Sequence, residues 1–135
     1  MAKSQRMTFF KITLEDKPGT LLEIARQLKS KNVGLTGLKA LGSMPGQTEA
    51  YLVPKNPEKL RTTLKKLGVT FEEGTSFFVK GADKTGALVK SLEAMAQAGI
   101  NIMTTDALAV GGKYGSFFGV QPSDVEKTAK VLGAK

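Results

Sequence analysis

The chain contains two copies of one pattern, and this repeat constrains the fold more than any single motif. Asp16–Leu22 and Lys31–Leu35 are matched by Asp83–Val89 and Ala98–Ile102, both 67 residues further along. Asn56–Gly68 is matched by Gln121–Gly133 at a spacing of 65 residues, so one loop of the second copy is two residues shorter. A fixed period of this length is typical of repeated supersecondary units. We therefore predict two domains, residues 1–74 and 75–135.

Both copies predict the same order of elements. Alternating apolar residues predict a strand, an Asp-Lys-x-Gly run ends it, and an apolar stripe then predicts a helix. In the first copy a second helix begins at Asn56-Pro57, which suit the N-cap and the first helical position. In the second copy Ser123 and Glu126 match a capping box. The predicted strands are 7–14, 33–41, 48–53 and 69–73, then 76–80, 100–110 and 116–120.

The β-α-β-β-α-β order predicts an α+β fold, with antiparallel sheets that carry both helices on one face. The second copy ends at Lys135 without a counterpart of strand 69–73. Its sheet is therefore expected to have an edge that another strand must pair or protect. We expect that strand to come from elsewhere, with a partner chain as one source.

Composition excludes several classes of function. The chain has no Cys and no His, so disulfides, thiolate or imidazole metal sites and the Ser-His-Asp triad are excluded. No apolar run approaches the ~20 residues of a membrane helix, and no secretory signal is visible, so we expect a cytoplasmic protein. We predict no enzyme activity, no cofactor and no metal.

The net charge of +8 lies entirely within residues 1–67, which indicates either a solvated basic face or an anionic partner. An RNA-binding module is the alternative function, because RNA-recognition motifs have the same element order and stack bases on strand aromatics. Four phenylalanines on predicted strands of the second copy would serve either base stacking or core packing: Phe77, Phe78, Phe117 and Phe118. A purely structural or oligomerisation module is a further alternative.

The repeated turn between the first strand and first helix is the main candidate binding site. Backbone N–H groups at a helix N-terminus bind small anions, and Gly19 or Gly86 allows close approach to the backbone. Asp16 or Asp83 offers an acceptor for a ligand ammonium group, so the turn suits a zwitterion such as an amino acid. A plain strand-to-helix turn, with Asp as the helix cap, explains the same residues. Asn101 is either a ligand contact or a turn residue at the start of its strand.

These residues resemble a known family. Leu14–Ala25 followed by Lys31–Leu35 resembles the opening of an ACT domain, with its acidic-x-Pro-Gly turn, apolar helix and second strand. The second copy is similar in Asp83–Leu88 and in the Gly-Ile-Asn-Ile run Gly99–Ile102. Two copies in register resemble a free-standing tandem ACT-domain protein over nearly the whole chain. The departures are Thr85 in place of Pro and Gly34 in place of Asn.

The resemblance implies a ferredoxin-like fold and a regulatory protein that binds an amino acid and acts on an enzyme in another chain. It also implies a homodimer, because ACT-type sheets often join edge to edge. ACT domains bind ligands between paired domains, where the turn of one meets the second strand of its neighbour. One implied site contains Asn101 with Asp16, Lys17, Pro18, Gly19 and Thr20. The other contains Gly34 with Asp83, Lys84, Thr85, Gly86 and Ala87.

Overall fold

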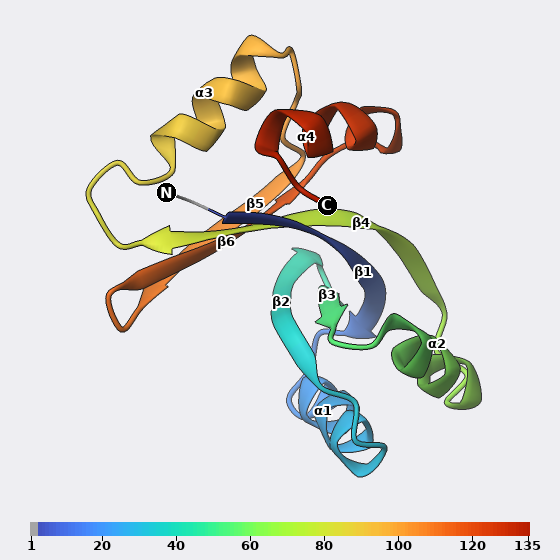
Figure 1. Cartoon of the computed structure of the whole chain (residues 1–135). Coiled ribbons are helices and arrows are strands. Elements are labelled where there is room, and N and C mark those ends of the chain that lie inside the picture. The colour runs from blue at the N-terminus through green and yellow to red at the C-terminus, as the bar shows by residue number, and fades with distance from the viewer. Residues whose placement is uncertain (1–2) are drawn as a thin grey trace. The chain divides into compact units, whose positions relative to one another are not determined.

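The structure is a computed structural model that describes residues 3–135 (Figure 1). The chain divides into two compact units. The N-terminal unit is Thr8–Gly74, and the C-terminal unit joins residues 3–7 to Thr75–Lys135. Two long strands, β1 (Lys3–Glu15) and β4 (Phe71–Ala82), are each divided between the two units.

The N-terminal unit has the strand order β2-β3-β1-β4 with two helices. Strand β3 pairs antiparallel with both β1 and β2. Helix α2 begins as predicted, because the Asn56 side chain accepts a hydrogen bond from the Lys59 N–H at 3.2 Å and Pro57 opens the first turn. The remaining elements are α1 (Thr20–Ser30), β2 (Leu35–Met44), β3 (Gln47–Pro54) and α2 (Pro57–Lys66).

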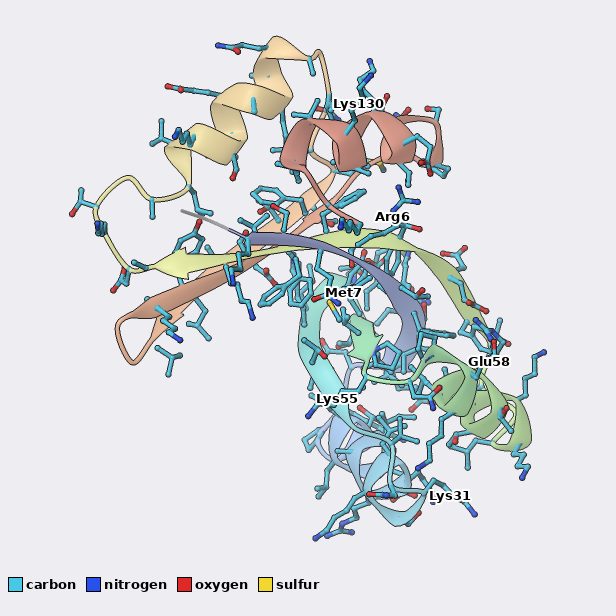
Figure 2. The ribbon with its side chains drawn as sticks, viewed as in Figure 1. Arg6, Met7, Lys31, Lys55, Glu58 and Lys130 are labelled. Atoms are coloured by element: carbon cyan, nitrogen blue, oxygen red, sulfur yellow. The ribbon has the colours of Figure 1, made fainter. Side chains whose placement is uncertain are left out.

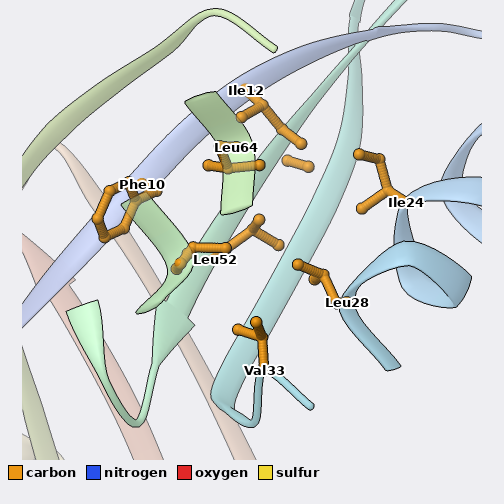
Figure 3. Packing of buried hydrophobic residues seen from close by; sticks show 9 residues of the cluster. Phe10, Ile12, Ile24, Leu28, Val33, Leu52 and Leu64 are labelled. Atoms are coloured by element: carbon orange, nitrogen blue, oxygen red, sulfur yellow. The ribbon is translucent and has the colours of Figure 1, made fainter. Parts of the chain in front are cut away.

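Alternate residues of the strands form the core of this unit. Phe10 and Ile12 of β1 and Leu52 of β3 are fully or almost fully buried, as period-two alternation predicts for a sheet covered on one face. Leu28 from α1 and Leu64 from α2 pack into the same cluster, so both helices cover that face (Figure 3).

The C-terminal unit has the same construction, with the order β1-β4-β6-β5. Its elements are α3 (Val89–Gln97), β5 (Thr104–Val110), β6 (Lys113–Gly119), a short 3-10 turn (Pro122–Asp124) and α4 (Val125–Leu132). Strand β6 pairs antiparallel with β4 and β5. Phe77, Phe118 and Met95 are fully buried in its core, beneath α3 and α4.

The fourth strand of the C-terminal unit comes from this chain, so the suggestion of a partner chain is wrong. Residues 3–7 of β1 belong to that unit, and β1 lies beside β4. Arg6 fixes this segment: its N–H donates to the Lys135 carbonyl at 3.2 Å. Its guanidinium donates to both carboxylate oxygens of Glu126 at 2.9 and 3.0 Å (Arg6 is labelled in Figure 2). The N-terminal residues thus supply the strand that the second copy lacks.

Other element boundaries also differ from the predictions. The strands expected at 69–73 and 76–80 are one continuous strand, β4. Gly74 lies inside it because the Phe9 ring covers the position: a Cβ at Gly74 would lie 2.5 Å from that ring. Strand β5 begins at Thr104 rather than at residue 100. The predicted capping box of Ser123 and Glu126 is wrong, because α4 begins at Val125 and its N-cap residue, Asp124, makes no side-chain cap bond.

The two structural units carry the same net charge, although residues 1–67 and 68–135 of the sequence do not. The N-terminal unit carries 11 Lys and Arg against 7 Asp and Glu, and the C-terminal unit carries 9 against 5. Each unit therefore has a net charge of +4. Among residues 3–135, no helix is long and apolar enough to cross a membrane.

Candidate functional site

The two strand-to-helix turns have the same backbone construction. The N–H of Asp16 donates to the carbonyl of Gly46 at 3.0 Å, and the N–H of Asp83 donates to that of Gly112, also at 3.0 Å. Gly19 and Gly86 follow with φ of 94° and 78°, which L side chains rarely adopt. Each turn is therefore anchored to the tip of the neighbouring hairpin in its own unit.

The first turn is closed by its own side chains. The Thr20 hydroxyl donates to the carbonyl of Glu15 at 2.7 Å and is 3.1 Å from that of Lys17. The Lys17 ammonium lies 2.8 Å from the Glu15 carboxylate, and this hydrogen bond lowers the pKa of Glu15 and raises the pKa of Lys17. Pro18 is exposed within the turn.

Asp16 does not cap helix α1. The N-cap is Gly19, which has no side chain, and one carboxylate oxygen of Asp16 accepts a hydrogen bond from the Thr48 hydroxyl at 3.2 Å. The interpretation of Asp16 as a cap is therefore wrong. Within the described residues, the N–H groups of Leu21 and Leu22 have no hydrogen-bond partner. These two N–H groups are therefore available to an acceptor, as is usual in the first turn of a helix.

The second turn is more open. Asp83, Lys84 and Thr85 are exposed, and in the described part of the chain their side chains make no hydrogen bond or ion pair. Ala87 replaces Thr20, so the hydroxyl that ties the first turn to its strand is absent. The N–H of Ala87 donates to the Lys84 carbonyl at 2.9 Å, and α3 begins only at Val89. The second turn is therefore two residues longer.

Sequence reasoning missed Tyr114, which is the C-terminal unit's counterpart of Thr48. Thr48 pairs with Leu14 across β1 and β3, and Tyr114 pairs with Gly81 at the equivalent place in β4 and β6. Tyr114 is 8% exposed, and its hydroxyl has no hydrogen-bond partner among residues 3–135. A buried hydroxyl without a partner is costly. The sequence held no such signal, because the repeat spacings of 67 and 65 residues align Tyr114 with Gln47 or Glu49, and only the strand pairing identifies Thr48 as its counterpart.

Gly34 and Asn101 lie at the other end of their units. The turn at Asp16 is bonded to the tip of the β2–β3 hairpin, whereas Leu35 pairs with Pro54 at the far end of β3. Strand β3 has eight residues, which correspond to about 25 Å. Asn101 is exposed before β5, and its side chain makes no hydrogen bond within the described residues. Pairings of Asn101 with Asp16–Thr20 and of Gly34 with Asp83–Ala87 join residues of different units and remain predictions.

The strand phenylalanines are divided between two surroundings. Phe77 and Phe118 are fully buried in the core, which confirms core packing for these two. Phe78 and Phe117 are half-buried and lie against each other, with ring centroids 4.7 Å apart. Asp106 of β5 is half-buried and accepts a hydrogen bond from the Phe117 N–H at 3.1 Å, so this carboxylate has a structural partner.

No family model and no curated protein matches the chain. Several solved structures do. Protein BT0572 from Bacteroides thetaiotaomicron is 22% identical with a TM-score of 0.84, and the match covers 96% of this chain and 88% of that one. The ligand-free regulatory subunit of aspartate kinase from Thermus thermophilus is 13% identical with a TM-score of 0.67, over 98% and 94%. The regulatory subunit of aspartate kinase from Thermus flavus is 17% identical with a TM-score of 0.61, over 98% and 94%.

These matches extend over nearly the whole of each chain, and at such identities they show a shared fold. The α+β prediction and the resemblance to paired ACT domains are both confirmed at this level. The chain has a duplicated ACT-like, ferredoxin-like fold.

Proposed function

We propose that this protein is a non-catalytic regulator that binds an amino acid at its strand-to-helix turns and acts on an enzyme in a separate chain. The repeated turn carries the proposal. It combines an exposed carboxylate, a glycine with positive φ and a helix N-terminus. A helix N-terminus attracts the carboxylate of an amino acid, and an aspartate attracts its ammonium group.

The structural neighbours support a regulatory role. Two of them are regulatory subunits of aspartate kinase, and they match this chain from end to end. The chain also lacks His and Cys, the side chains that most often perform acid–base and nucleophilic chemistry near neutral pH. We place the protein in the cytoplasm, where such a regulator meets its enzyme.

We further propose a homodimer. Strands β2 and β5 each form the outer edge of the sheet in their unit. They expose apolar side chains, including Leu41 at 41%, Leu108 at 72% and Val110 at 71%. Unpaired edges with apolar side chains favour pairing with another chain. Sedimentation equilibrium tests this proposal, and a monomer at high micromolar concentration would contradict it.

The ligand is tested by thermal unfolding of the full chain with each of the twenty amino acids. A ligand at about 100 times its dissociation constant stabilises a protein by roughly 2.7 kcal/mol, which shifts the midpoint by several degrees. One amino acid should give such a shift, and Asp83→Asn or Asn101→Ala should reduce it. Glu93→Gln is the control, because Glu93 is an exposed carboxylate within α3 and belongs to neither turn. No shift with any amino acid, or equal loss in the control, would contradict the proposal.

A further inference from the structure

A shallow groove lies on the N-terminal unit where α1 ends and β2 begins. Its volume is about 350 Å³, within the usual range for small binding sites. The floor is apolar, with Leu28 and Val33 buried beneath it. Seven residues line it: Ala25, Leu28, Lys29, Asn32, Val33, Gly34 and Leu35. None of them is acidic.

Lysines surround this groove. Lys29 lines it, and Lys31 follows on the loop after α1. The stem of Lys55 lies against Gly34, because a Cβ there would be only 3.2 Å from the Lys55 Cδ, and the Lys55 N–H donates to the Gly34 carbonyl at 2.9 Å. The Lys59 ammonium donates to the Asn32 carbonyl at 2.9 Å. Figure 2 labels Lys31 and Lys55 at this end of the unit.

Three of these lysines have no carboxylate partner among the described residues. Across residues 3–135, Lys29, Lys31 and Lys55 form no ion pair. By contrast, Lys11 and Lys17 of the same unit lie within 4 Å of carboxylates: Lys11 at 3.6 Å from Glu49 and Lys17 at 2.8 Å from Glu15. Lys29 at the groove, and Lys31 and Lys55 beside residues that line it, are therefore three positive charges without an ion-pair partner among residues 3–135.

The second copy shows that the fold does not require these lysines. Its helix end has the same backbone: the Ile100 N–H donates to the Met95 carbonyl at 2.9 Å, as the Val33 N–H does to the Leu28 carbonyl at 2.8 Å. At the positions of Lys29, Lys31 and Lys55 the second copy has Ala96, Ala98 and Val120. The same local structure thus forms without any of the three charges.

We propose that this groove is a docking surface for an acidic segment of a partner protein, one that inserts an apolar side chain between flanking aspartates or glutamates. The apolar floor takes the side chain, and the lysines pair with the carboxylates, which steers association and selects the partner. A nucleic acid fits less well, because no aromatic side chain lines the groove to stack a base. The groove lies at the other end of the N-terminal unit from the Asp16–Thr20 turn and shares only Gly34 with a predicted amino-acid site, so it adds a protein-binding function to the proposed amino-acid regulation.

The test is a titration of the ¹⁵N-labelled full chain, followed by amide shifts. The probe is a seven-residue peptide with a central leucine flanked by glutamates, and the matched peptide has glutamines instead. The glutamate peptide, added to about 1 mM, should shift Lys29–Leu35 and Lys55 in a saturable way that weakens with salt. Each of Lys29→Gln and Lys55→Gln should weaken binding by up to about five-fold, the upper end of the usual effect of one exposed charge pair.

The control variant is Lys66→Gln, which removes the same charge from an exposed position of α2 outside the groove. It should leave the peptide affinity within error of the parent chain. Four results would overturn the proposal: no saturable shifts, equal binding of the glutamine peptide, equal weakening by Lys66→Gln, or tighter binding of inorganic phosphate or a single-stranded oligonucleotide at the same residues. Thermal unfolding of Lys29→Gln with the amino acids separates this proposal from the proposed function. A variant that binds the peptide more weakly but keeps the amino-acid shift of the parent chain shows that the groove and the amino-acid site act independently.

Discussion

Replacing Asn56 with alanine tests how much one cap stabilises the N-terminal unit. The Asn56 side chain accepts a hydrogen bond from the Lys59 N–H at 3.2 Å, and Ala removes this acceptor while leaving Pro57 in place. Loss of an N-cap side chain costs about 1 kcal/mol. The N-terminal unit has 67 residues, so its unfolding entropy near 60 °C is about 0.14 kcal/mol per degree. The midpoint should therefore fall by about 7 °C if this unit unfolds alone, and by about half that if the whole chain unfolds together.

The second copy supplies the matched control. Gln121-Pro122 occupies the positions of Asn56-Pro57, and Gln121 makes no side-chain cap bond. Gln121→Ala should therefore leave the midpoint unchanged, and Asn56→Asp should retain most of the stability because aspartate is also a good cap. Circular dichroism during thermal and urea unfolding measures all three variants. An equal loss in Gln121→Ala, or a loss in Asn56→Asp as large as in Asn56→Ala, would refute the reasoning.

Three further predictions use single contacts. The Arg61 guanidinium donates two hydrogen bonds of 2.7 Å to Glu73, which lowers the pKa of Glu73 below its usual 4.5. The stability that this pair contributes is therefore complete above pH 4.5 and is lost as the pH falls through the lowered pKa. Glu73→Gln should flatten that part of the pH profile in urea unfolding. Gly74→Ala brings a Cβ within 2.5 Å of the Phe9 ring and should cost about 1–3 kcal/mol, partly recovered in the double variant with Phe9→Leu. Tyr114→Phe removes a buried hydroxyl without a partner, so it should leave unfolding in urea unchanged or raise stability by about 1 kcal/mol. A marked loss of stability in that variant would show that the hydroxyl has a partner.

The repeat allowed much of the fold to be predicted. Periodicity together with the glycine and proline turns predicted the helices and the two hairpins, and the Asn-Pro pair at residues 56–57 correctly marked the start of α2. These are local signals, since each depends on residues within one or two turns of the chain.

The wrong predictions have a common cause. Each concerns a residue whose structure is decided by a contact with a residue far away in the sequence. Nothing near Lys3 indicates that residues 3–7 complete the unit formed by Thr75–Lys135, because the strand that they accompany lies some 70 residues away. Gly74 falls between the predicted strands 69–73 and 76–80, and its place inside β4 becomes clear only from the Phe9 ring that packs over it. Asp16 suits a helix cap by composition, but Thr48 from a distant strand holds its carboxylate.

The duplication separates what the fold requires from what it leaves free. Features present in both copies, such as the Asp N–H bonded to a hairpin glycine and the glycine with positive φ, are needed to turn a strand into a helix. Features present in only one copy are not needed to form the fold, because the other copy folds without them. The Thr20 and Thr48 hydroxyls close the first turn, whereas the second has Ala87 and an unpaired Tyr114 hydroxyl. Lys29, Lys31 and Lys55 at the groove of the first copy are replaced in the second copy by Ala96, Ala98 and Val120. The first copy thus has a closed turn and three lysines at its groove, whereas the second copy has an open turn and none of these lysines. Residues that differ between the copies are therefore the ones that we expect to decide what each unit binds.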